Sequence, residues 1–583
     1  MKAYTALAAA LLLLAPAALA TTSYQAILEA EAAGELSVDQ TVLYLTYSVI
    51  SPELLPAEYA TLETERCGTP ALHDAYLRRE DASEPIRRQL LDLARPTLSG
   101  PEYTFDSDEG YFKIHWTDQG VDATTLEYCE EIADAADLSW ETEVNEMGYY
   151  APPSDQGLGG DTKYDIYVMQ LSGGTLGYTT CAGEPSNPST PNNDKASHIV
   201  MDSDIYSDGT KICTVAHEFQ HACQMAADAD EPSWFMENCA VWMEEQVYPE
   251  INDYSGYISG ESALRRPMWD IRSGPMYHYG AFTWPWFMEN SISVESVLDV
   301  WVNCAEEWGA NMLEAQSDMF ESNGTNFEHA FMLYGYYRWC TYENWYAGCG
   351  LYDEEAAGWS PGPLVINGYH YFDELPALDI NDMVGLAGDV YELDAYGIHY
   401  IQVELADYQD GWVQIDFDGR DNFEWNLASI LYSEAGDSQF QWFNVEAPDN
   451  ELSFAVEANG WDYVIFFPAF MTDTGLDANY DMDITYSTGV EGGAVTPEAL
   501  GLSLSANPVT PQGSVNVDLP AAGRAELRVY DMSGRRVATL CNAELAAGSH
   551  SFGLQGLDLD TGTYLFNLAS GNQITTTKAV VVR

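Results

Sequence analysis

The hydrophobic pattern changes its period once along these 583 residues, at about residue 385. Before that point apolar residues recur mostly at helical spacing, as in Asp122 to Met147, with a few strand-like runs between them. After it, apolar and polar residues alternate in short runs such as His399 to Leu405, separated by Asp and Gly turns. Because the chain is too long for one hydrophobic core, we expect a multidomain protein with an α+β part followed by β-sandwiches.

These patterns divide the chain into five segments. Residues 1–20 have the charged start, apolar run and small-residue end of a signal peptide, and no later window is long and apolar enough for a membrane helix. Residues 21–104 are expected to be mostly helical. An α+β domain is expected over 105–380, with strands at 111–116, 164–171 and 198–201 before helices at 211–227 and 233–247. A β-sandwich at 381–490 and, after a linker-like stretch, a second one at 500–583 complete the chain.

The charge balance is strongly acidic, with 92 Asp and Glu against 22 Lys and Arg and a formal net charge of −70. Such a polyanion repels nucleic acids and anionic membranes, so both are excluded as partners. Two explanations stay open: solubility, for example in a salty habitat, or calcium binding by the oxygen-rich loops at 106–110 and 202–209. Neither loop has EF-hand spacing, so a solvated acidic turn is the simpler interpretation of each.

The motif HEFQH at 217–221 carries the most specific chemistry. His217 and His221 are one helical turn apart, so both imidazoles can reach one zinc ion. Glu218 is turned away from them, where its carboxylate can take a proton from a zinc-bound water. A hydrolytic zinc needs a third protein ligand; Glu237, on the next expected helix, is our candidate, and Glu244, two turns further, can orient a ligand histidine.

HEFQH followed by W-x-x-E-x-x-A at 234–240 resembles the glutamate-liganded zincins, and most closely the secreted bacterial metallopeptidases such as the bacterial collagenases. The resemblance covers about 105–345 and implies a zincin-like catalytic domain with Glu237 as the third ligand. Ala240 matches the small residue of the pattern, whereas Asn238 stands where many members have Gly. The stretch at 277–282 resembles the segment that carries the catalytic tyrosine, which assigns Tyr277 as oxyanion donor, with His278 and Tyr279 as alternates.

Arg66-Cys67-Gly68-Thr69-Pro70 resembles the R-C-G-x-P of matrix-metallopeptidase propeptides, where the cysteine thiolate caps the zinc. This resemblance implies that 21–104 is a propeptide and that Cys67 is a cysteine switch. The alternative is a disulfide, since an even number of cysteines, ten, suits an exported protein.

The last domain resembles the C-terminal sorting domain of type IX secretion substrates, through pieces such as Val529-Tyr530-Asp531-Met532-Ser533-Gly534-Arg535 and the closing residues 578–583. The resemblance implies export by the type IX machinery to the medium or the outer cell surface. The alternative is an accessory β-sandwich without that role.

We therefore expect a secreted zinc-dependent endopeptidase that hydrolyses extracellular protein, with Zn²⁺ and, as the alternative above allows, Ca²⁺ as cofactors. The competing hypothesis is a cell-surface binding or adhesion protein on a catalytically silent zincin scaffold. Chelator-sensitive hydrolysis distinguishes the two.

Overall fold

The computed structural model describes residues 22–60, 62, 65–93, 95–181, 193–260, 262–306, 311–344 and 354–359, short strands at 366–367 and 378–379, and most of 393–581 with its longest gap at 488–500. The expected signal peptide at 1–20 and nearly all of the linker-like stretch lie outside the described residues. No helix in the described part is long and apolar enough to cross a membrane.

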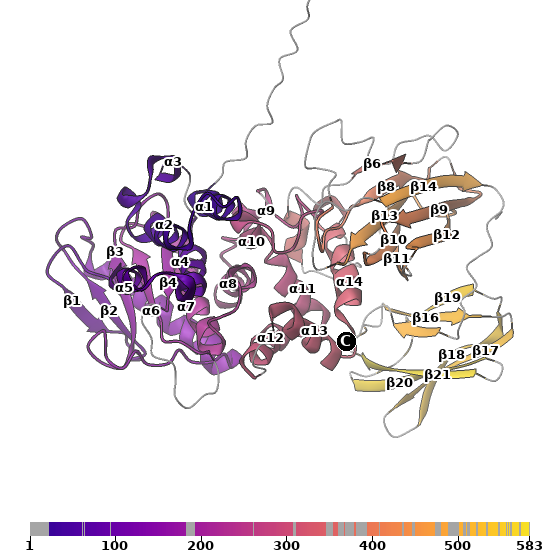
Figure 1. Ribbon diagram of the computed structural model, residues 1–583. Helices are drawn as coiled ribbons and strands as arrows, with labels where there is room; N and C mark the ends of the chain where they lie inside the picture. The colour runs from indigo at the N-terminus through magenta and orange to yellow at the C-terminus, as the bar shows by residue number, and fades with distance from the viewer. Residues whose placement is uncertain are drawn as a thin grey trace, which may run out of the picture.

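A mixed five-stranded sheet forms the centre of the N-terminal α/β region (Figure 1). The strand order is β1 (Tyr103–Asp106), β2 (Phe112–Trp116), β3 (Tyr164–Met169), β5 (His198–Asp202) and β4 (Gly177–Thr180). The central strands β2, β3 and β5 are parallel and correspond to the three strands expected from the sequence. The antiparallel edges β1 and β4 were not expected.

Helices cover both faces of this sheet, as alternation along β5 shows. Ile199 and Met201 pack into the main core with α6 (Leu126–Trp140) and α7 (Asp208–Ala227). Val200, between them, points to the other face and packs in a separate core with the N-terminal helices. Those helices are α1 (Ser23–Ala32), α2 (Val38–Ile50), α3 (Ala57–Ala60), α4 (Thr69–Arg78) and α5 (Glu84–Leu93). The N-terminal segment is therefore a packed layer of the fold.

Helix α7 begins where the Ser207 side chain accepts a hydrogen bond from the backbone N–H of Thr210, a standard N-cap. It packs along α8 (Ser233–Val247), and both helices are almost wholly buried. After α6 the chain makes a π-helical turn at Glu141–Met147 and ends it at Gly148, whose φ of 91° suits glycine. The remaining helices are α9 (Ser255–Ile258), α10 (Pro275–Gly280), α11 (Thr283–Ser291), α12 (Glu295–Glu306), α13 (Met312–Ser322) and α14 (Phe327–Trp339).

Two pairs of mainly antiparallel sheets make up the C-terminal half, and each pair has its own hydrophobic core. The first pair is β11-β10-β13-β8-β6 and β12-β9-β14-β7, formed by β6 (Ile366–Asn367), β7 (Leu378–Asp379), β8 (Ile401–Glu404), β9 (Trp412–Gly419), β10 (Trp425–Ser433), β11 (Asp437–Asn444), β12 (Glu451–Glu457), β13 (Tyr463–Phe470) and β14 (Tyr480–Ser487). The second is β15-β16-β19 and β18-β17-β20-β21, formed by β15 (Gly501–Leu504), β16 (Ser514–Leu519), β17 (Gly523–Asp531), β18 (Arg536–Leu545), β19 (Gly548–Gly553), β20 (Gly562–Ser570) and β21 (Gln573–Val581). This agrees with the expected sandwich-like second half.

Candidate metal centre

The packing of α7 against α8 brings together the three residues expected to bind a metal. Glu237 on α8 places Oε2 3.2 Å from Nε2 of His217 and Oε1 3.0 Å from Nε2 of His221. All three side chains are buried. The two histidines lie one turn apart on α7, so their rings are neighbours, with ring centroids 4.9 Å apart.

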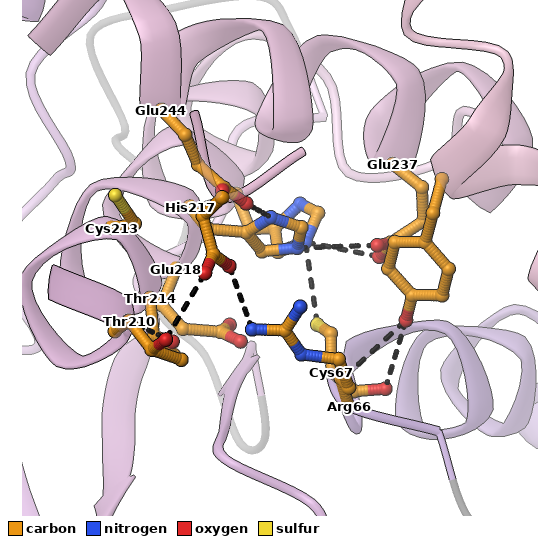
Figure 2. Close-up of polar contacts among 12 residues, drawn as sticks. Arg66, Cys67, Thr210, Cys213, Thr214, His217, Glu218, Glu237 and Glu244 are labelled. Carbon is orange, nitrogen blue, oxygen red and sulfur yellow. Dashed lines mark hydrogen bonds and ion pairs between the residues drawn. The ribbon is translucent and has the colours of Figure 1, made fainter. Parts of the chain in front are cut away.

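A fourth donor comes from the N-terminal segment. The Sγ atom of Cys67 lies 3.5 Å from Nε2 of His221, and the thiol forms no disulfide. The four donor atoms of Cys67, His217, His221 and Glu237 all lie within 4.8 Å of one another (Figure 2). Tetrahedral zinc with bonds of roughly 2.0–2.3 Å separates its ligand atoms by about 3.3–3.8 Å. Two imidazoles, a carboxylate and a thiol in this arrangement fit such a site.

Each histidine is oriented by a partner at its other ring nitrogen. Nδ1 of His217 lies 2.8 Å from Oε1 of Glu244, as the sequence suggested. Nδ1 of His221 lies 2.9 Å from Oε1 of Gln224, whose amide N–H donates to the Met236 carbonyl and so fixes the amide orientation. Donation from Nδ1–H to these partners would leave the Nε2 lone pair of each histidine for a metal, which is the tautomer a metal needs.

The cluster attracts positive charge. Burial alone would lower the pKa of His217, but hydrogen bonds with Glu237 and Glu244 outweigh burial and raise that pKa to about 10. Burial would raise the pKa of Glu237, but the charge of His221 and hydrogen bonds from both histidines hold it well below its ordinary value. Burial, followed by Glu218 and Glu237, raises the pKa of the Cys67 thiol, so a cation is needed to favour the thiolate there.

Glu218 lies beside this cluster, and its carboxylate is held by two hydroxyls. Oε2 accepts hydrogen bonds from Thr179 on β4 at 2.9 Å and from Thr69 of the N-terminal segment at 3.1 Å. A Cβ on Gly177 would lie 3.0 Å from Cγ of Glu218, so the glycine gives this side chain its room. The carboxylate therefore lies near the cluster and is in contact with the N-terminal segment.

The N-terminal segment reaches the site by pairing with the edge strand β4. Gly68 N–H donates to the Gly177 carbonyl at 2.9 Å, and Leu176 N–H donates to the Arg66 carbonyl at 2.7 Å. A Cβ on Gly68 would lie 2.5 Å from Cγ1 of Val49, so this close approach requires glycine. The next residues begin α4, with a proline in its first turn.

The two tyrosines considered as oxyanion donors lie in different places. Tyr277 packs against Trp269. Burial raises the pKa of its hydroxyl, and the nearby charged side chains that also change this pKa are Arg338 and Asp270. The hydroxyl of Tyr279 instead accepts from the Cys67 backbone N–H at 3.3 Å, and its ring centroid is 6.2 Å from that of His217. Tyr279, the alternate, is therefore the tyrosine next to the cluster.

The other alternate, His278, contacts a backbone carbonyl. Nε2 of His278 lies 3.1 Å from the Arg272 carbonyl. Asn238, which departs from the Gly of the resembled pattern, donates to the His278 carbonyl at 2.8 Å and so ties α8 to α10.

In each acidic loop considered for calcium, one carboxylate contacts a protein donor. Asp106 pairs with Lys113 at 2.9 Å, and Asp202 accepts from the Leu171 N–H at 2.8 Å.

Sequence reasoning missed three polar partners: Gln224, Thr69 and Thr179. Gln224 lies three residues after His221 on the same helical face, so its spacing was a readable signal. The two threonines come from distant segments, and nothing in their local sequence marks them.

Comparison with known families covers two parts of the chain. Residues 119–340 match a family of unknown function, DUF6055. Residues 507–583 match the secretion system C-terminal sorting domain. The chain carries a type IX sorting domain. It is therefore exported to the extracellular space or the cell surface and interacts with the type IX machinery. No curated protein matches the chain.

Some solved structures resemble parts of the chain. PorZ, an essential surface component of the type-IX secretion system of Porphyromonas gingivalis, is 15% identical over 26% of this chain and 22% of its own, with a TM-score of 0.13. Dimeric latent PorU from the same organism is 15% identical over 30% of this chain and 18% of its own, with a TM-score of 0.14. A β-1,2-glucanase from Parabacteroides distasonis is 9% identical over 32% and 31%, with a TM-score of 0.12. The chain spans under a third of each, and these likenesses carry no functional argument.

Proposed function

We propose that the chain is a secreted zinc-dependent endopeptidase held latent by its own N-terminal segment. The observation that carries the proposal is the convergence of His217, His221, Glu237 and Cys67 on one point, with donor atoms within 4.8 Å of one another, beside the Glu218 carboxylate. The two imidazoles and the Glu237 carboxylate correspond to the three-ligand set of a glutamate zincin, and Glu244 and Gln224 are the outer partners of the imidazoles.

Each group has a role in peptide hydrolysis. A zinc ion held by His217, His221 and Glu237 would supply Lewis acidity, which would polarise the peptide carbonyl and lower the pKa of water. Glu218 takes the proton as the water oxygen forms its bond to the carbonyl carbon, and then gives a proton to the leaving amine nitrogen as the C–N bond breaks. The Tyr279 hydroxyl donates to the oxyanion of the tetrahedral intermediate.

The N-terminal segment blocks three parts of the proposed site: the metal position, the Glu218 carboxylate and the edge of β4. The thiol of Cys67 takes the position that a reacting water or carbonyl needs, and Thr69 holds the carboxylate of Glu218. The backbone at 66–68 pairs with β4, the edge strand on which an extended peptide can add. We therefore expect full activity only after the segment is removed.

The test uses the full chain with a site-specific protease sequence placed in the connection between α5 and β1, residues 95–101. Before cleavage we expect bound zinc, measured by elemental analysis, and little hydrolysis of casein or gelatin. After cleavage and separation of the N-terminal segment we expect hydrolysis that a zinc chelator abolishes. Glu218→Gln, which keeps the ligands, is the matched control: it retains zinc but does not hydrolyse. Absence of chelator-sensitive hydrolysis from the cleaved, zinc-loaded protein rejects the enzyme and favours the binding-protein hypothesis.

A further inference from the structure

The Arg66 side chain lies between a carboxylate and an aromatic ring, next to the cluster of metal-ligating side chains described above. Its Nη2 lies 2.7 Å from Oδ2 of Asp253, and its Cζ lies 5.3 Å from the ring centroid of Tyr257. Thr210 on α7 donates to the other oxygen of Asp253 at 3.0 Å, which holds the carboxylate in place. A carboxylate and an aromatic face that both contact one guanidinium form a site that can bind a cation.

The Arg66 site is connected to the proposed catalytic site through stacked tyrosines. The Tyr257 ring stacks on the ring of Tyr279, with centroids 5.0 Å apart and an interplanar angle of 16°. Arg66 directly precedes Cys67 in the chain, so a cation here is one residue from the group at the cluster. Burial alone would lower the pKa of Arg66, but Tyr257, Asp253 and Glu244 outweigh it and raise it above its ordinary value.

The backbone that carries Arg66 is held as a peptide substrate can be held. Its carbonyl accepts from the Leu176 N–H, immediately before the edge strand β4. When the N-terminal segment leaves, these backbone groups, Asp253 and Tyr257 stay on the enzyme. An extended peptide that pairs with the same edge then brings a side chain to the place of Arg66.

We infer that Asp253, Tyr257 and Thr210 form a specificity subsite that selects substrates with an arginine, and more weakly a lysine, next to the scissile bond. Arginine is preferred because a planar guanidinium can pair with the carboxylate and lie over the ring together. The net charge of −70 adds long-range attraction for basic peptides. This inference rests on the proposed peptidase function.

Two measurements test it. First, the cleaved protein digests a complex peptide library, and the cut sites are read by mass spectrometry. We expect arginine to be enriched at one position beside the cut bond. In Asp253→Asn that enrichment disappears and kcat/KM for an arginine peptide falls about tenfold, mainly through KM, while a neutral peptide is unaffected. Glu250→Gln, an exposed carboxylate near the site, is the matched control and behaves as wild type.

The second measurement does not need hydrolysis. A synthetic peptide of residues 62–71 is titrated onto cleaved Glu218→Gln protein, beside the same peptide with Arg66→Gln. We expect about tenfold weaker binding of the altered peptide, and no difference between the peptides when Asp253→Asn is added. If the cleaved wild type hydrolyses peptides without preference for a basic residue, the subsite is wrong and the peptidase stands. If it hydrolyses nothing, the peptidase fails. Equal binding of the two peptides overturns the subsite in either case.

Discussion

Replacement of Glu244 by glutamine isolates the contribution of an outer partner to metal affinity. Its Oε1 accepts from Nδ1–H of His217 at 2.8 Å, and the side chain is only 5% exposed. Loss of such a partner typically costs 10–100-fold in metal affinity, or about 1.4–2.7 kcal/mol. Because glutamine keeps an acceptor oxygen and loses only the charge, we expect Glu244→Gln to lie near the lower end, at about tenfold.

The assay is zinc competition against a chromogenic chelator at neutral pH, on the uncleaved full chain. Glu250→Gln is the control, because it removes an exposed carboxylate nearby without touching a ligand. In parallel, urea unfolding of the metal-free proteins separates a metal effect from a structural one. Because Glu244 helps to hold the buried His217 in its charged form, the substitution is also expected to destabilise the metal-free fold, and the urea measurement reports that loss separately from the loss of zinc affinity. Unchanged zinc affinity in Glu244→Gln, or an equal loss in the control, refutes the reasoning.

Three further predictions follow from single contacts. Cys67→Ser should weaken zinc binding to the uncleaved chain and release measurable activity before cleavage; a fully latent variant with wild-type affinity contradicts the thiol's role. Tyr279→Phe should lower kcat of the cleaved protein by about 10²-fold without zinc loss, whereas Tyr277→Phe should leave kcat within twofold; the reverse result restores the original assignment. Burial lowers the pKa of His399 to about 3, against about 6.5 unfolded. Its contribution to stability is therefore complete above the unfolded value and is lost as the pH falls, by about 2 kcal/mol at pH 5. Urea unfolding across this pH range should show that loss, and His399→Gln should reduce it.

The grouping of His217, His221 and Glu237 on α7 and α8 was predictable from helical geometry. His217 and His221 must share a face, and a second helix that starts soon after returns alongside the first. Glu244 follows from Glu237 by the same rule, two turns further on. These inferences need only the period of the α-helix, which the sequence states directly.

The tyrosine and the edge strand were not predictable for local reasons. Helix α10 is short and starts after Gly274, whose φ of 42° sets a direction that no residue pattern encodes. Motif alignment therefore selected Tyr277, two residues from the hydroxyl that reaches the cluster. Strand β4 shows no alternation because all four of its residues are buried. One face lies on α7 and the other under the N-terminal segment, so the strand has no polar side to reveal its period.

Cys67 stands 150 residues before HEFQH, and no spacing rule connects the two; only its resemblance to a known inhibitory motif pointed there. The structure supplies a physical reason for its position. Glu218, Glu237 and Glu244 place three buried carboxylates around two imidazoles. With neutral histidines this interior carries three negative charges, and a dication reduces the net charge to minus one. A thiolate then adds one more negative charge beside Glu218, whose carboxylate Thr69 and Thr179 already hold. The Thr69 hydroxyl thus offsets part of the repulsion that the thiolate creates, which explains why one short segment supplies both groups.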